Sequence, residues 1–99
     1  MSAEKLKGSW FQYFPEHYLW SQVMCAYINI VPMGGSNFHE IDQVGKRLQG
    51  KEGDAEAWGE NWGWMADKTL ALATSEEKRG HPRTAAAAYV RGAVYRFNS

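Results

Sequence analysis

The chain has 99 residues, of which 44% are hydrophobic and 22% are charged. This length accommodates one small domain, and the share of apolar residues argues against intrinsic disorder. Eleven Lys and Arg residues balance eleven Asp and Glu residues, so the chain lacks the basic excess with which nucleic-acid binders neutralise phosphates. Five Trp residues are unusual at this length. Each indole buries about 200 Å², and we expect some to be half-exposed or covered by a partner, because a short chain has little interior.

The cysteine and hydropathy patterns predict a cytoplasmic protein. Cys25 is the single cysteine, which excludes an intrachain disulfide and favours a reducing compartment. The longest apolar run, residues 23–28, is far shorter than the ~20 residues that span a bilayer. Residues 1–8 are polar and lead into no signal-peptide core. We expect no membrane association, a single helical domain over residues 1–99, and a flexible lead over residues 1–9.

Four helices are predicted, which makes the expected fold all-α. The first runs from Glu16 to about Val31, because apolar residues recur on one helical face and Pro32 cannot continue the helix. The β-branched residues within 28–31 leave a strand open as an alternative at this end. The residues of the apolar face are Leu19, Val23, Met24, Tyr27, Ile28 and Val31.

The second helix is predicted after a Gly-Gly loop. Asn37 followed by Glu40 is typical of a capping box, in which each side chain accepts from the other residue's backbone N–H. The helix therefore begins at Phe38 and continues through Leu48, and Gly50 is a plausible terminator.

The third and fourth helices are predicted to form a long antiparallel αα-hairpin, the main element of the fold. The third runs over Ala55 to about Arg79, with Asp54 as its N-cap. The fourth runs over Pro82 to about Phe97. Because the turn through Gly80 is short, the two helices must pack against each other.

Apolar spacing predicts which face of each hairpin helix is buried. The seam of the third helix comprises Trp58, Trp62, Met65, Thr69 and Leu72. The stripe of the fourth comprises Ala86, Tyr89, Val90, Ala93 and Phe97. We expect Trp58 and Trp62 to lie in the core and Trp64, roughly 160° from the seam, to face solvent or a partner. Gly59 and Gly63 each cost the helix about 1 kcal/mol, which suggests a close backbone approach.

Three stretches resemble catalytic or binding motifs, but each lacks a residue that the chemistry needs. Residues 45–52 match a phosphate-binding loop until Glu52, which cannot replace the magnesium-binding Ser or Thr. His39 begins an H-E-x-x-H zinc pattern, but Gln43 stands at the second His position. The Gly-Gly-Ser loop resembles a nucleophile elbow until Phe38, which is too large for the tight turn. The sequence therefore predicts no catalytic residue, no metal and no cofactor in this chain.

Two regions, residues 34–40 with the sequence GGSNFHE and spaced positions within residues 57–96, resemble the N-terminal helical region of a group of α/β-hydrolases. This group includes 2,6-dihydroxypseudooxynicotine hydrolase and the fungal hydrolases that shorten polyketide chains in pigment biosynthesis. The resemblance covers about residues 10–97. The first region is Gly34-Gly35-Ser36-Asn37-Phe38-His39-Glu40, in which Asn37 replaces a more frequent acidic residue. The second comprises Ala57-Trp58, Glu60, Trp62, Ala66, Gly80-His81-Pro82, Ala85, Ala88-Tyr89, Arg91, Ala93 and Tyr95-Arg96.

The resemblance implies that the chain is the lid, or cap, of an enzyme that hydrolyses C–C or ester bonds. A hydrolase core, on a partner chain or in a missing C-terminal part of the same protein, would supply the Ser-Asp-His triad. The lid would cover the active site and exclude water. From their position near the first helix and the Gly-Gly loop, we expect Tyr18, Met24, Met33 and Phe38 to line the substrate pocket.

Two other readings stay open. The chain could be an autonomous helical interaction module without catalytic activity, and an exposed aromatic face would then favour a homo-oligomer. It could also be a small enzyme that uses His39 and Glu40. Neighbouring residues on a helix point about 100° apart, however, which disfavours joint acid–base chemistry.

Overall fold

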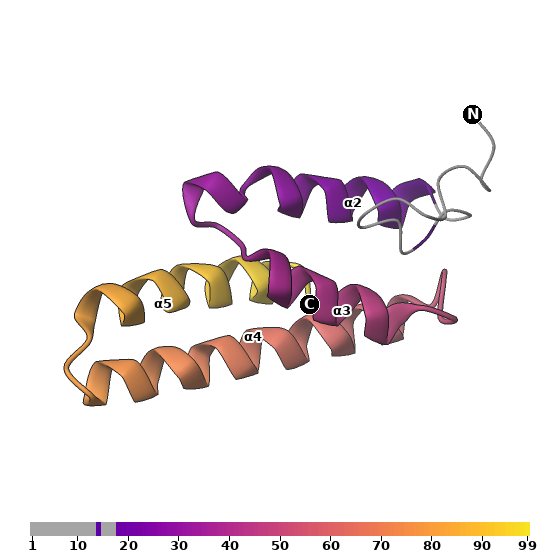
Figure 1. Ribbon diagram of the computed structural model, residues 1–99. Helices are drawn as coiled ribbons and strands as arrows, with labels where there is room; N and C mark the ends of the chain where they lie inside the picture. The colour runs from indigo at the N-terminus through magenta and orange to yellow at the C-terminus, as the bar shows by residue number, and fades with distance from the viewer. Residues whose placement is uncertain (1–13, 15–17) are drawn as a thin grey trace.

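The computed structural model describes residue 14 and residues 18–99, and all regular structure in that part of the chain is helical. It comprises helices α2 (Tyr18–Asn29), α3 (Phe38–Leu48), α4 (Ala55–Lys78) and α5 (Pro82–Phe97), with a 3₁₀ turn η1 (Val31–Met33). Figure 1 shows α4 and α5 side by side as an antiparallel pair, with α3 next to α4 and α2 next to α3. The predicted all-α fold and its hairpin are confirmed. The predicted lead over residues 1–9 lies outside the described residues.

Helix α2 ends at Asn29, two positions before the predicted end, and the strand alternative is not formed. Pro32 is the reason, because its missing N–H suits the start of a new turn rather than the interior of an α-helix. It lies in η1 instead, and Gly34 closes that turn with a φ of 79°. This left-handed conformation costs glycine little. The chain then reverses toward α3.

The N-cap of α3 is confirmed, but the predicted capping box is only half formed. The Asn37 side chain accepts from the backbone N–H groups of His39 at 2.9 Å and Glu40 at 3.2 Å. Glu40 does not return the bond. The backbone N–H of Asn37 donates instead to the hydroxyl of Tyr95 at 3.0 Å, and Glu40 turns to partners on α5. A tertiary contact has therefore replaced the local one.

The hairpin begins and ends close to the predicted residues. Asp54 accepts from the backbone N–H of Ala57 at 3.0 Å, which caps α4. Helix α4 ends at Lys78, one residue earlier than predicted. The turn closes with a hydrogen bond from His81 N–H to the Glu76 carbonyl at 2.9 Å. Helix α5 begins at Pro82 as expected.

The buried face of α4 is largely the predicted one, whereas that of α5 is not. Trp62, Met65 and Thr69 are at most 1% exposed, but Leu72 at the end of the seam is 43% exposed. On α5 the predicted stripe faces outward, with Val90 52% and Phe97 91% exposed. The residues turned inward are Ala85, Ala88, Gly92 and Tyr95.

The close contact between α4 and α5 explains this orientation. A Cβ atom added at Gly92 would lie 2.5 Å from Cδ2 of Leu70, so Leu70 fills the space that the missing side chain leaves. The close approach predicted at Gly59 and Gly63 is wrong, because the close contact between α4 and α5 lies at Gly92. Added Cβ atoms there would meet no atom closer than 3.6 Å, an ordinary van der Waals distance.

The core contains a continuous series of packed rings, which we call the aromatic ladder. Its members are Phe14, Trp20, Trp58, Trp62, Tyr27 and Tyr95, and neighbouring ring centroids lie between 4.7 and 6.2 Å apart. Asn98, the residue after α5, adds a polar contact to the ladder. With its amide oxygen oriented toward the indoles, it accepts from Trp58 Nε1 at 3.2 Å and from Trp62 Nε1 at 3.0 Å. The Trp side chains on α2 and α4 are therefore covered largely by this chain. The exposed large apolar side chains lie partly on α5 (Tyr89, Val90 and Phe97) and partly on other elements (Leu19, Met33, Phe38 and Leu72).

Candidate functional site

A part-buried group of polar side chains joins α3 to α5 around Glu40. Arg91 Nε donates to Glu40 Oε1 at 2.8 Å, and its Nη2 donates to Oε2 at 3.3 Å. The Tyr95 hydroxyl donates to Oε1 at 2.7 Å, while accepting from the backbone N–H of Asn37. The side chains of Arg91 and Glu40 are only 16% and 14% exposed. We call these four residues the Glu40 cluster.

The Glu40 cluster is suited to holding helices together rather than to catalysis. Both carboxylate oxygens of Glu40 already accept hydrogen bonds. Burial raises the pKa of Tyr95, and its hydrogen bond to Glu40 raises that pKa further. The phenol therefore keeps its proton near neutral pH and acts as a fixed donor. The carboxylate of Glu40 and the phenol of Tyr95 are thus both engaged in contacts between α3 and α5.

A groove of about 330 Å³ runs beside this cluster between α3 and α4. Its lining combines polar and apolar side chains: His39, Glu40, Gln43, Met65, Lys68, Thr69 and Leu72. Lys68 Nζ donates to Gln43 Oε1 at 2.9 Å, and Gln43 Nε2 lies 2.7 Å from His39 Nε2. The groove therefore has a hydrogen-bonded polar side next to an apolar floor.

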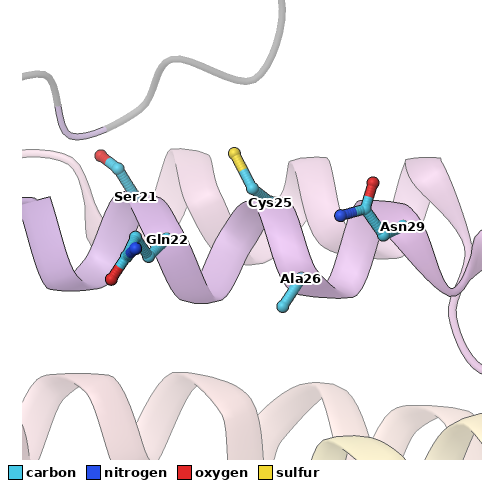
Figure 2. A pocket seen from close by; sticks show the side chains of 5 residues that line it. All are labelled: Ser21, Gln22, Cys25, Ala26 and Asn29. Carbon is cyan, nitrogen blue, oxygen red and sulfur yellow. The ribbon is translucent and has the colours of Figure 1, made fainter.

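A second, shallow depression of about 340 Å³ lies on the outer face of α2. Figure 2 shows Ser21, Cys25 and Asn29 pointing the same way, away from the helices below. Ser21 Oγ donates to the carbonyl of Phe14 at 2.5 Å. Cys25 is an exposed free thiol, and the described part of the chain contains no group of three metal-ligating side chains. The depression is open, and most of its accessible lining is apolar.

Three of the four predicted pocket residues have described side chains, and these lie in different environments. Met24 is fully buried in the core, whereas Met33 is 77% and Phe38 45% exposed. Tyr18 begins α2, and its side chain lies outside the described part of the chain. Their role in lining a substrate pocket stays a prediction.

Trp64, predicted to face solvent or a partner, is less exposed than that prediction implies, and its contact with a partner stays a prediction. It is partly buried against the core, and the guanidinium carbon of Arg47 lies 3.8 Å from its ring centroid. Lys68 Nζ lies 5.1 Å from the same centroid. Two cations therefore cover this indole, an arrangement that stabilises exposed aromatic faces. Trp58, also partly buried, and the buried Trp62 pack within the chain.

Sequence reasoning missed Lys68 and the partners of Glu40. One signal was available, since His39 and Gln43 are four residues apart and so meet on one helix face. The contacts of Glu40 with Arg91 and Tyr95 bridge more than fifty positions and have no local signature.

None of the described helices is both long and apolar enough to cross a membrane. No protein-family model matches the chain, and comparisons with curated proteins and with solved structures found no match either.

Proposed function

We propose that the chain is the helical lid of an α/β-hydrolase-type enzyme that cleaves C–C or ester bonds, with the Ser-Asp-His triad supplied by a core outside these residues. The sequence resemblance suggests the enzyme class. One structural observation carries the proposal: α5 presents an apolar face that the described part of the chain leaves uncovered.

This face, the α5 seam, has the composition of a buried surface. It comprises Ala86, Val90, Ala93 and Phe97, which recur at spacings of four, three and four. That spacing is typical of a helix that packs against a neighbour. Two of the three charged side chains of α5 are engaged in ion pairs, Arg91 with Glu40 and Arg96 with Asp67, and the third, Arg83, lies at the N-terminal end of the seam. Burying Val90 and Phe97 would contribute about 1.5–3 kcal/mol each.

A lid does not need reactive groups of its own. It needs a firm internal structure and a surface that fits the core, and it acts by excluding water from the reaction. The aromatic ladder and the Glu40 cluster provide the first, and the α5 seam provides the second. This division agrees with the engagement of Glu40 and Tyr95 in helix packing.

The test is co-expression with an α/β-hydrolase chain that carries a G-x-S-x-G elbow and is encoded beside or in frame with this one. We expect the two to co-purify and aryl-ester hydrolysis to require both. Val90→Glu should separate them, whereas Ala71→Glu, an exposed position on α4, should not. Hydrolysis that is unchanged by the presence of this chain would contradict the proposal.

An autonomous interaction module is the second candidate, favoured by the completeness of the interior. Every buried side-chain nitrogen and oxygen in the described residues has a hydrogen-bond partner, which is a mark of a well-packed fold. A chain that is monomeric, melts cooperatively and binds no hydrophobic dye would support the module. Aggregation or dye binding that only a hydrolase core relieves would support the lid.

A further inference from the structure

The groove between α3 and α4 contains one acidic side chain, and that charge is already compensated. Glu40 contributes to the lining, but Arg91 and Tyr95 occupy its two oxygens from the α5 side. A ligand in the groove would therefore meet little negative potential from Glu40.

Lys68 supplies the positive charge of the groove. Its contacts within the described part of the chain are the Gln43 amide oxygen and the ring of Trp64, neither of which is a carboxylate. An ammonium group has three N–H donors, and the bond to Gln43 uses one. A cation with donors to spare at the edge of an apolar surface is complementary to an anion with an apolar body.

The hydrogen-bond chain fixes where this charge lies. Because Gln43 Oε1 accepts from Lys68, Gln43 Nε2 must face His39 and donate to its Nε2. These hydrogen bonds hold the ammonium of Lys68 at the polar side of the groove.

The apolar floor lies next to the ammonium. Met65 and Thr69 are 1% exposed and are therefore packed within the protein, whereas Leu72 is 43% exposed. Leu72 is thus the accessible aliphatic side chain of the floor. The volume of about 330 Å³ is at the small end of the range for ligand sites, roughly 300–1,000 Å³. This volume suits one ring and a short side chain.

We propose that the α3–α4 groove binds a small arylalkyl carboxylate, with the carboxylate on Lys68 and the ring against Leu72. The proposal stands apart from the lid role, because every lining residue belongs to this chain. It also assigns a site that does not include the four pocket residues predicted from sequence.

Titration of the full chain with 4-phenylbutyrate and with its neutral amide tests the proposal. Calorimetry gives the affinities, and amide chemical shifts on α3 and α4 locate the site. We expect the acid to bind about tenfold more tightly than the amide, the effect of one charge-assisted hydrogen bond.

Lys68→Gln should remove the preference for the acid while leaving the fold unchanged by circular dichroism. Lys78→Gln is the matched control, since Lys78 is an exposed lysine at the end of α4, outside the groove. Leu72→Asn should weaken acid and amide alike. Equal binding of acid and amide to the unaltered chain, equal effects of the two lysine variants, or shifts confined to other helices would overturn the proposal.

Discussion

Tyr95 and Glu40 are 55 positions apart in the chain, and the Tyr95 hydroxyl donates to Glu40 Oε1 at 2.7 Å. The same hydroxyl accepts from the backbone N–H of Asn37. One fully buried phenol therefore joins the first turn of α3 to the last turn of α5. A buried hydroxyl that serves two partners is costly to remove, because both partners lose a hydrogen bond away from water.

We expect Tyr95→Phe to lower the free energy of unfolding by about 1–3 kcal/mol. The Phe ring keeps the contacts with Trp62 and Tyr27, so the change isolates the hydroxyl. Tyr89→Phe is the control, because the Tyr89 hydroxyl bonds Glu77 at an exposed position, and we expect it to cost under about 0.5 kcal/mol. Urea denaturation measures both, and equal losses would contradict the importance of the buried hydroxyl.

The pair of Glu40 and Arg91 should behave as a coupled unit. Glu40→Leu leaves the Arg91 guanidinium largely buried without its carboxylate, and we expect a loss of about 3 kcal/mol. The double variant Glu40→Leu/Arg91→Leu should recover much of this, because no unpaired charge remains. The exposed pair Asp42–Lys46 provides a comparison, with a coupling of about 0.3–0.5 kcal/mol. Additive effects at Glu40 and Arg91 would exclude coupling.

The ends of the later helices were predictable because they depend on local chemistry. Asn37 and Asp54 cap their helices with their own side chains, and Pro82 begins α5. At Gly80, the left-handed φ of 78° follows from the residue type. Each of these signals acts within a few residues, so the sequence alone carries it.

The orientation of α5 and the candidate site were not predictable in the same way. Helix α5 has one face of small residues and another of larger apolar residues, and either face could pack against α4. Which face turns inward depends on the contact between Leu70 and Gly92. The capping-box pattern predicts that the Glu40 side chain accepts from the backbone N–H of Asn37, but its partners are Arg91 and Tyr95 on α5. The link from Gln43 to Lys68 likewise spans two helices. Single-sequence periodicity contains no information about such pairs.

Stability should fall at alkaline pH, and the buried Tyr27 should account for part of the fall, together with Tyr95. Burial raises the pKa of Tyr27 to about 12, whereas an unfolded tyrosine ionises near 10. The unfolded state therefore binds fewer protons between these values, so the stabilisation is complete below pH ~10 and is lost as the pH rises toward ~12. We expect Tyr27→Phe to flatten this decline in urea midpoints, with Tyr89→Phe as the control. If the urea midpoint of the Tyr27 variant declines equally steeply with pH, ionisation of other groups causes the decline.

Two glycine-to-alanine substitutions should change stability in opposite directions. At Gly92 the new Cβ would lie 2.5 Å from Leu70 Cδ2 and 2.7 Å from its Cγ, and we expect a net loss of about 1 kcal/mol, because overpacking outweighs the gain in helix propensity. At Gly63 the nearest atoms are 3.6 and 3.7 Å away, so we expect Gly63→Ala to gain up to about 1 kcal/mol.

The contact with Leu70 can be tested directly by thermal and urea denaturation. In a Leu70→Ala background the obstructing atoms are gone, so Gly92→Ala should become neutral or stabilising. If Gly92→Ala costs the same in both backgrounds, the loss comes from the backbone of α5 rather than from Leu70. The inward orientation of Gly92 would then need another cause, because the close contact with Leu70 is what distinguishes this face from the α5 seam.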